Sequence, residues 1–494
     1  MAPASLLSVS NGQAVDLETV PVLGLPEFRN AVLSLVGKGS RLSALFGHPA
    51  DGKRVRLYAV LADGSAGSLV VLSADVEGRY PSLACECPQA ELFERELFEQ
   101  WRINPEGHPW LKPVRFNSSP RPLPGAMDYY RVSGSEVHEV AVGPVHAGII
   151  EPGHFRFQCY GEDVLHLEIA LGYQHRGIEQ ALPGGPHPRT LYQMETLAGD
   201  TSIGHATAYA QIVEALSDSR VPPRAESLRA IALELERLAN HAGDLGALAG
   251  DVGYQPTASF CGRLRGDFLN MTALLCGNRF GRGLIRPGGV GFDVDERLAE
   301  ALLAKLEASF RDLAEAAGLL WKTPSVLARF EGVGGLSRPL AVELGLVGPA
   351  ARACGLERDA RFEFPGGFFR FGQIPVSTWH TGDVFSRAYL RWLEIERSVI
   401  FVRERLGTLP DGPVRVEVKP LHPNRLVIAL VEGWRGEIAH VALTDGQGRL
   451  ARYKIVDPSF HNWKGLALAM RGGQISDFPL INKSFNLSYA GHDL

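Results

Sequence analysis

The sequence is poor in cysteine. Six cysteines occur among 494 residues, at positions 85, 87, 159, 261, 276 and 354. So low a content gives no disulfide framework and is typical of a protein from a reducing compartment. No two of them have the CxxC spacing with which proteins present two thiolates to zinc, nickel or an iron–sulfur cluster. A metal centre held by thiolates of this chain is therefore not expected.

Long apolar runs and blocks of one charge are also missing. No window approaches the roughly 20 apolar residues of a transmembrane helix, and the opening MAPASLLSVSNGQ lacks the features of a signal peptide. The formal net charge of −5 comes from interspersed acidic and basic residues, so no basic segment could neutralise a run of phosphates. We expect a globular protein that does not bind nucleic acid and that meets a membrane only through partner subunits.

Length and hydrophobic pattern indicate an α+β fold with two main parts. A chain of 494 residues with 45% hydrophobic content exceeds what one core usually serves. Residues 20–117 mix alternating apolar stretches with Asp-Gly and Gly-Ser turns, which predicts a small α+β domain. Residues 118–134, which include the proline-rich SSPRPLPGAM, are expected to form a linker. A large domain should follow over residues 135–494.

Apolar side chains at three- and four-residue steps predict long buried helices in the large domain. The pattern is clearest between Pro223 and Gly250, and it recurs over residues 294–321 and 383–407. A bundle of at least four long helices should form the core. Alternation returns from about Val414 and predicts a β-rich cap, and the glycines of RPGGVG are expected to form a tight turn.

Several long motifs follow one another through the large domain. They are GPVHAGIIEPGHFRF (143–157), LGYQHRGIEQ (171–180), ETLAGDTSIGH (195–205), ELERLANHAGDLGAL (234–248), NRFGRGLIRPGGVG (278–291) and GDVFSRAYLRWLEIERS (382–398). This series resembles the large subunit of energy-converting, formate hydrogenlyase-type [NiFe]-hydrogenases and the related 49-kDa quinone-site subunit of respiratory complex I. Upstream, FEREL and WRINPEGHPWLKP resemble the 30-kDa complex I subunit, which formate hydrogenlyase-type proteins carry fused in front. The resemblance implies a helical-bundle domain of hydrogenase large-subunit type with β additions.

The resemblance also implies a metal centre whose ligands this chain lacks. Family hydrogenases hold nickel and iron with two cysteine pairs, and these positions here carry Ala198 and Thr201, then Ser459 and Asn462. Alanine offers no donor, and hydroxyl and amide oxygens prefer harder ions than nickel. We predict that the Ni–Fe centre is absent and that this chain by itself holds no cofactor, whereas a partner iron–sulfur subunit would carry a [4Fe–4S] cluster.

In the complex I subunit a histidine and a tyrosine bind the quinone headgroup. The motifs put Pro152 and Gly199 at these two positions, so the resemblance does not imply quinone reduction of the standard kind. NAD belongs to a different subunit in such assemblies, and the sequence leaves its involvement open.

Other polar residues of the family's buried site are present. Glu151 stands where family hydrogenases have a proton relay, for which burial would raise the carboxyl pKa toward neutrality; a turn or capping carboxylate is the alternative. Asp200, His205, Arg237 and His241 are predicted to form a connected network in the cavity, because polar groups on apolar helices are costly unless partnered. The alternative is a set of separate, satisfied core residues.

Two further sets of polar residues have competing interpretations. The resemblance implies that His175, Arg176 and Glu179 face the cluster of the iron–sulfur subunit, although a surface ion pair would look the same. Scattered histidines such as His146 and His154 fit no zinc signature such as HExxH, which disfavours a metal-dependent hydrolase.

Three functions remain from the sequence. The first is a hydrogenase-related subunit without hydrogen chemistry that couples electron arrival at a partner [4Fe–4S] cluster to proton or ion pumping. Its partners would be the iron–sulfur small subunit and antiporter-like membrane subunits, with this chain peripheral on the cytoplasmic face. The second is an oxidoreductase that reduces quinone or another acceptor in the vacated cavity. The third is a non-catalytic structural subunit.

Overall fold

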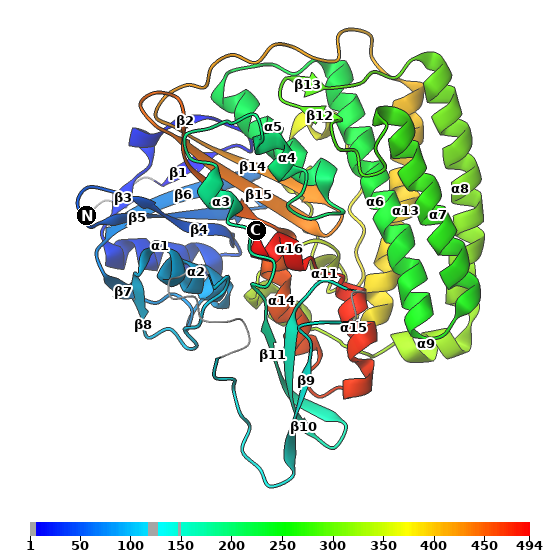
Figure 1. The fold of residues 1–494 in the computed structure, drawn as a ribbon, viewed down its shortest axis with the longest axis horizontal. Coiled ribbons are helices and arrows are strands. Elements are labelled where there is room, and N and C mark those ends of the chain that lie inside the picture. The colour runs from blue at the N-terminus through cyan, green and yellow to red at the C-terminus, as the bar shows by residue number, and fades with distance from the viewer. Residues whose placement is uncertain (1–5, 117–126, 147–149) are drawn as a thin grey trace.

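The structure is a computed structural model, and it describes residues 6–116, 127–146 and 150–494. Figure 1 shows a sheet of N-terminal strands on one side, a bundle of long helices on the other, and a second sheet between them. The C-terminus lies near the middle of this view, between the N-terminal sheet and the bundle. Residues 118–126 of the predicted linker lie outside the described residues, and the predicted domain boundaries stay a prediction.

The N-terminal sheet is formed mainly by three long antiparallel strands. They are β4 (Arg41–Pro49), β5 (Val55–Asp63) and β6 (Ser68–Val76); β1 (Leu7–Val9) and β3 (Val22–Leu23) also pair with β6. Helices α1 (Leu25–Gly37) and α2 (Glu91–Trp101) pack beside this sheet, and the short strands β7 (Arg79–Pro81) and β8 (Asn104–Glu106) pair in parallel. Helix α1 begins with a capping contact, because the Glu27 carboxylate accepts from the Gly24 N–H.

The second sheet is buried on both faces. It consists of β14 (Arg425–Gly433), β15 (Gly436–Thr444) and β16 (Leu450–Val456), and the N-terminal β2 (Val15–Asp16) adds to its edge. Side chains alternate between faces along a strand. Leu426, Ile428 and Leu430 join the core of the N-terminal sheet, whereas Val427 and Ala429 join the core of the bundle. The second sheet thus connects the two parts of the chain.

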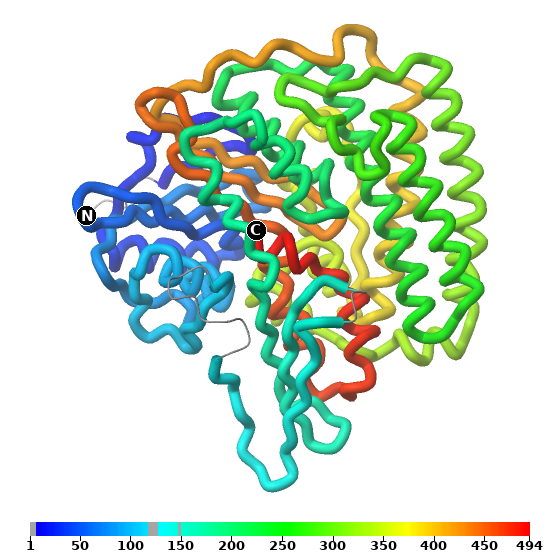
Figure 2. Tube along the Cα trace, in the orientation of Figure 1, coloured from blue at the N-terminus to red at the C-terminus, as the bar shows by residue number. Residues whose placement is uncertain are grey.

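Five long helices make up most of the bundle. They are α5 (Ser202–Leu216), α6 (Pro223–Asp251), α7 (Gln255–Cys276), α8 (Glu296–Lys322) and α13 (Val384–Gly407). Helix α6 contacts each of the other four, which explains why apolar side chains occur around so much of its circumference. In Figure 2 the chain from α13 to β14 runs along one edge of the molecule and returns from the bundle to the second sheet.

The remaining elements are shorter. A three-stranded sheet, β9 (Val137–Val142), β10 (His154–Tyr160) and β11 (Asp163–Ala170), projects from the body of the molecule (Figure 1). The last segment is helical: α14 (Pro458–Ala469), α15 (Phe478–Phe485) and α16 (Tyr489–Asp493). Short elements elsewhere are β12 (Ile285–Arg286), β13 (Gly289–Val290), α3 (Ile178–Ala181), α4 (Thr190–Met194), α9 (Pro324–Phe330), α10 (Arg338–Glu343), α11 (Gly348–Arg352), α12 (Ala360–Glu363), η1 (Leu17–Thr19), η2 (Pro88–Ala90), η3 (Gly367–Arg370) and η4 (Ile475–Asp477).

The predicted α+β class and the three periodic helices are confirmed. Helices α6, α8 and α13 begin and end within two residues of the ranges that the apolar spacing predicts. The RPGGVG segment forms a hairpin between β12 and β13. The expectation of a β-rich cap is correct only up to Val456, because the chain beyond Asp457 folds into α14, α15 and α16. In the described part of the chain, no helix is both long enough and apolar enough to cross a membrane.

Candidate functional site

The β14–β15 turn, Gly433–Gly436, carries an arginine into the interior. The Arg435 guanidinium donates to both oxygens of Asp200, at 2.5 and 2.9 Å, and lies over the Trp434 ring. The turn packs so closely against Gly348 that both Gly348 and Gly436 have to be glycine. A Cβ at Gly348, whose φ is +63°, would lie 2.2 Å from the Arg435 carbonyl oxygen, and a Cβ at Gly436 would lie 2.8 Å from the Gly348 backbone. Close backbone contact therefore fixes where Arg435 can reach.

Asp200 lies in the turn that leads into α5, beside Thr201. The Trp434 indole N–H donates to the Asp200 carbonyl oxygen at 3.0 Å and contacts the Thr201 hydroxyl at 3.2 Å. Burial opposes ionisation of Asp200, but Arg435 outweighs it and the pKa of the carboxyl is lowered. At neutral pH the position therefore holds a carboxylate–guanidinium pair.

His205, on the first turn of α5, belongs to a buried chain of four polar side chains. Its Nε2 lies 3.1 Å from Asp457 Oδ2, its Nδ1 lies 3.1 Å from His440 Nε2, and His440 Nδ1 lies 2.9 Å from the Tyr453 hydroxyl. With both imidazoles neutral, Tyr453 donates to His440, His440 to His205, and His205 to Asp457. All hydrogen-bonding atoms of the two rings are then satisfied, and each donor points toward Asp457.

The protonation states follow from the surroundings of this chain. Burial, together with the neighbouring His205, holds the pKa of His440 well below its usual range. Burial also raises the pKa of Tyr453. Burial alone would raise the pKa of Asp457 as well, but the hydrogen bond from His205 and the charge of Arg435 outweigh it, and the pKa of Asp457 is lowered. A resting state with ionised Asp457, neutral His440 and protonated Tyr453 results.

Arg237 and His241 meet on α6, as their i, i+4 spacing predicts. Both contact Glu394 of α13: Arg237 Nη1 at 3.4 Å and His241 Nε2 at 2.8 Å from Oε2. Arg237 also donates to the Glu432 and Gly433 carbonyl oxygens at the start of the β14–β15 turn. The four predicted network residues are therefore divided among three sets of side-chain contacts: Arg237 and His241 share Glu394, Asp200 pairs with Arg435, and His205 contacts Asp457 and His440.

Glu151 lies against the last helix. Its carboxylate accepts from the backbone N–H groups of Tyr489 and Ala490, at 3.1 and 3.4 Å. Burial raises the pKa of Glu151, while these hydrogen bonds and Arg435 partly oppose the shift. The side chain thus caps α16 and also has the raised pKa that a relay would need.

The three residues predicted to face a partner occupy different environments. His175 Nδ1 lies 2.7 Å from the Asp493 carbonyl oxygen, and the exposed Arg176 donates to the carbonyl oxygens of Thr196 and Leu197. Glu179 is buried inside this chain, where it contacts Arg452 and Lys454 at 3.0 and 3.1 Å. Glu179 therefore does not form a surface ion pair and is not exposed on the surface of this chain. Arg452 and Lys454 neutralise its carboxylate in the interior.

The positions that replace the family's cysteine pairs lie just before α5 and in the first turns of α14. Ala198 and Thr201 precede α5, and Ser459 accepts from the Ser488 N–H at 2.8 Å. Asn462, one turn after Ser459 on α14, exchanges two hydrogen bonds between its amide group and the Val347 backbone, next to the point where Gly348 approaches Arg435.

The last helix, α16, lies across from the Ala198–Thr201 turn. Arg176 Nη2 joins the two segments, at 2.9 Å from the Leu197 carbonyl oxygen and 3.5 Å from that of Ala490. A Cβ at Gly491 would lie 2.6 Å from the Asp457 carboxylate, so this acid fills the space beside the helix. The described residues contain no group of three or more His, Cys, Asp or Glu side chains placed to hold a metal ion.

Sequence reasoning missed the partners that complete the site. Arg435, His440, Tyr453 and Asp457 come from the second sheet and its exit, more than 200 residues after Asp200 and His205. A Trp-Arg pair between two glycines, flanked by apolar alternation, predicts only a turn.

Comparison with known proteins places the chain in a family. The family described as "Respiratory-chain NADH dehydrogenase, 49 Kd subunit" matches residues 251–426 and 416–493. The carbon monoxide-induced hydrogenase of Rhodospirillum rubrum is 33% identical over 356 residues, 71% of this chain and 97% of that protein. Formate hydrogenlyase subunit 5 of Escherichia coli is 30% identical over 488 residues, 92% of this chain and 85% of that protein.

Subunits of NADH-quinone oxidoreductases are also among the relatives. NADH-quinone oxidoreductase subunit 4 of Thermus thermophilus is 30% identical over 379 residues, 71% of this chain and 93% of that protein. The chain thus belongs to the family of the 49 Kd subunit of the respiratory-chain NADH dehydrogenase. A chain from the membrane-bound sulfane sulfur reductase, an archaeal respiratory membrane complex, has the same fold, with a TM-score of 0.67 and 22% identity over 73% of this chain and 99% of its own.

Proposed function

We propose that this chain is the large, hydrogenase-related subunit of a membrane-bound, complex I-like oxidoreductase that has no Ni–Fe centre. It would couple electron transfer from a partner subunit with a [4Fe–4S] cluster to ion translocation by antiporter-like membrane subunits. Its place would be on the cytoplasmic face of these subunits. Relatives named as subunits of hydrogenases and NADH-quinone oxidoreductases support this class of complex.

The observation that carries the proposal is the content of the site between the Ala198–Thr201 turn and the last helix. Asp200, Arg435 and Asp457 occupy this region, and the six cysteines of the chain lie elsewhere. Nickel in a hydrogenase-type centre needs soft thiolate donors. Two ionised carboxylates and a guanidinium supply no such donor.

A second candidate function is reduction of an acceptor, such as a quinone, within the same cavity. The buried chain from Tyr453 to Asp457 favours it, because reduction of a quinone consumes protons that must reach a site closed to water. Each of the three hydrogen bonds between the four side chains of this chain is 3.1 Å or shorter. A proton could pass along such a line by successive transfer.

Replacing Glu151 by glutamine tests the relay role in ion translocation. The change keeps an acceptor oxygen for the α16 backbone but removes the titratable proton, so we expect the ratio of ions moved per electron to fall at least twofold. The measurement uses the assembled complex in vesicles, with a pH-sensitive dye inside and electron transfer recorded in parallel.

Glu139→Gln is the matched control, since Glu139 is an exposed carboxylate paired with Arg156 on the projecting sheet. This variant should pump as the unchanged complex does. Undiminished pumping by Glu151→Gln would remove the relay role and leave Glu151 as a helix cap.

A further inference from the structure

A second group of buried charges lies behind the β14–β15 turn, between α6, α13, β14 and the segment from α11 to α12. No member is more than 5% exposed, and the group is called the charge cluster below. Its members are Glu234, Arg237, His241, Arg352, Asp359, Arg361, Glu394 and Glu432.

Arg352 is the central cation. Its Nη1 lies 2.6 Å from Glu432 Oε1 and its Nη2 lies 2.8 Å from Glu394 Oε1. The other oxygen of Glu394 lies 2.8 Å from His241 Nε2. A continuous line of contacts therefore joins Glu432 to His241 through one guanidinium and one carboxylate.

The other two arginines are already committed to carboxylates. Arg361 contacts Asp359 at 2.6 Å and Glu234 at 2.9 Å. Arg237 contacts Glu234 at 3.1 Å and Glu394 at 3.4 Å. Neither has a contact to the Glu432 carboxylate, which depends on Arg352 and on the Ala360 N–H.

The cluster is short of one positive charge. Four carboxylates face three guanidinium groups and one imidazole, so full ionisation with a neutral imidazole would leave one negative charge buried. The cations nearby are already engaged, Arg391 with Asp244 at 2.6 Å and Arg435 with Asp200. Glu363, near Glu432, supplies no compensating positive charge, and burial raises the pKa of its carboxyl to about 7. An unpaired charge inside a protein is costly, and binding a proton removes it.

Two members can hold that proton. Burial raises the pKa of Glu432 to about 6, with Arg352 opposing and Asp359 adding to the shift. Burial lowers the pKa of His241, and its hydrogen bond with Glu394 opposes that shift. His241 Nδ1 is buried and has no hydrogen-bond partner among the residues that the structure describes. Glu394 itself stays ionised: burial opposes this, but Arg352 and His241 hold its pKa well below the usual range.

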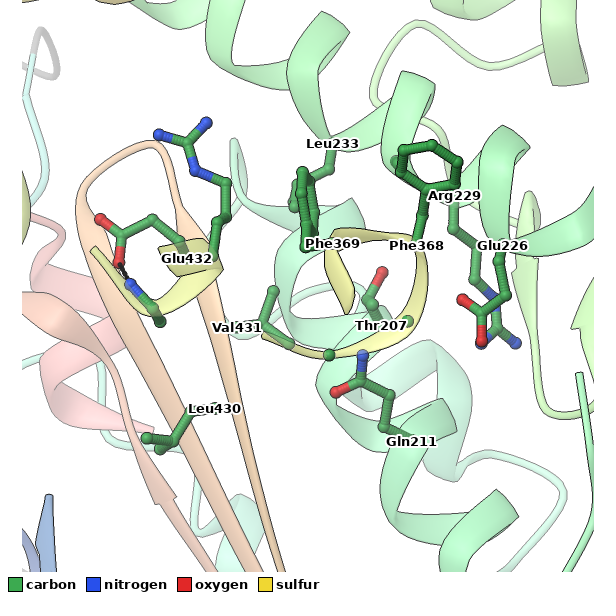
Figure 3. A pocket seen from close by; sticks show the side chains of 15 residues that line it. Thr207, Gln211, Glu226, Arg229, Leu233, Phe368, Phe369, Leu430, Val431 and Glu432 are labelled. Carbon is green, nitrogen blue, oxygen red and sulfur yellow. Dashed lines mark hydrogen bonds between the residues drawn. The ribbon is translucent and has the colours of Figure 1, made fainter. Parts of the chain in front are cut away.

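A cleft connects this cluster to the surface. Figure 3 shows Glu432 at one end of it and Glu226 with Arg229 at the other, with Phe368 and Phe369 between them. Its volume is about 30 Å³, which is room for about two water molecules. The Thr207 hydroxyl on its wall is buried without a hydrogen-bond partner in the described structure, and Gln211 is partly exposed at its mouth. Polar, unsatisfied walls favour water there.

The opposite end of the cluster touches the candidate site. Arg237 donates to the Gly433 carbonyl oxygen, and the His241 ring meets the Trp434 ring edge-on with centroids 6.2 Å apart. Trp434 donates in turn to Asp200. A change of charge in the charge cluster therefore alters the electrostatic environment of the turn that holds Arg435.

We propose that the charge cluster binds one exchangeable proton, shared between Glu432 and His241, and that this proton enters from solvent through the cleft beside Glu226. The proton balances the negative charge of an electron that arrives at the partner's iron–sulfur cluster. This second part rests on the proposed function, whereas proton binding as such does not.

Infrared difference spectroscopy of the assembled complex tests proton binding without turnover. A protonated carboxyl group has a carbonyl band that an ionised carboxylate lacks, and we expect such a band to grow as the pH falls through the neutral range. The part of this band that comes from Glu432 should be missing in Glu432→Gln, in which three carboxylates face three guanidinium groups, whereas contributions from Glu151, Glu236 and Glu363, whose pKa values burial also raises, should remain. A band of undiminished intensity in this variant would overturn the assignment.

Glu437→Gln is the matched control, because Glu437 is a buried carboxylate on the neighbouring strand that pairs with Arg41. The band should survive in it, and its loss would show that the signal does not come from the charge cluster. His241→Asn gives an independent check. With the competing base removed, the midpoint of the carboxyl titration should move to higher pH; an unchanged or lower midpoint would refute sharing of the proton.

The route and the coupling have separate readouts. Glu226→Gln should keep the band but slow its shift after transfer to D₂O at least tenfold, and an unchanged rate would refute entry through the cleft.

Reduction of the complex with dithionite should increase the band at fixed pH. A band that titrates but ignores reduction would overturn the coupling and leave proton binding intact, so the two failures can be told apart.

Discussion

Replacing Arg352 by methionine should lower the free energy of unfolding by about 3–5 kcal/mol. The guanidinium neutralises Glu394 and Glu432 at 2.8 and 2.6 Å, and all three side chains are almost fully buried. Methionine fills a similar space but leaves buried carboxylates facing too few cations. Chemical unfolding followed by circular dichroism would measure the loss.

Two variants show whether charge is the cause. Arg403→Met removes an arginine whose pair with Glu307 is about half exposed, and it should change stability by less than about 1 kcal/mol. Glu432→Gln added to Arg352→Met should recover part of the loss, since it removes one of the stranded charges. If the double variant were no more stable than Arg352→Met, lost packing rather than lost charge would explain the effect.

Replacing His205 by asparagine should lower turnover of the assembled complex at least 100-fold. Asparagine keeps a donor for Asp457 but cannot accept one proton while releasing another. Loss of a positioned acid–base group typically lowers the rate by about 10²- to 10⁴-fold. Oxidation of a reduced viologen dye with a short-chain quinone as acceptor would be followed in wild type and variant.

Tyr453→Phe is the companion variant at the far end of the same chain. It removes only the last donor, so His440 keeps its bond to His205 and turnover should fall less than tenfold. Full turnover by His205→Asn would contradict a catalytic cavity and favour the third hypothesis, a structural subunit.

Local features of this protein could be predicted from its sequence. Helices α6, α8 and α13 follow from apolar spacing, because apolar residues at three- and four-residue steps can be recognised in the sequence over a few helical turns. The hairpin at Gly288 and Gly289 follows from glycine, since both residues have positive φ. The family followed from long motifs that hold their order along the chain.

The composition of the site could not be predicted in the same way. Asp200 and Arg435 are 235 residues apart, and no local pattern indicates that a β-turn arginine will meet a carboxylate from the start of α5. The tail beyond Asp457 also differed from its expected strands, because proline at the first turn of α14 and an Asp457 cap begin a helix there. Long-range pairing decides the first case, whereas the second follows from a local helix-start signal, an Asp cap followed by proline.

The surroundings of Glu179 and Asn462 could not be predicted from the motifs that contain them. Both belong to segments that the resemblance marks as functional. Glu179 forms buried ion pairs with Arg452 and Lys454 of β16. The Asn462 amide donates one hydrogen bond to the Val347 backbone and accepts another from it. Buried polar groups take the partners that the fold supplies.

Metal analysis of the purified, assembled complex tests the central claim most directly. Nickel and iron would be quantified per copy of this chain, with hydrogen uptake measured on the same sample using a dye as electron acceptor. The account predicts iron from the partner's cluster, no stoichiometric nickel and no hydrogen uptake. One nickel per chain together with hydrogen-dependent dye reduction would contradict it.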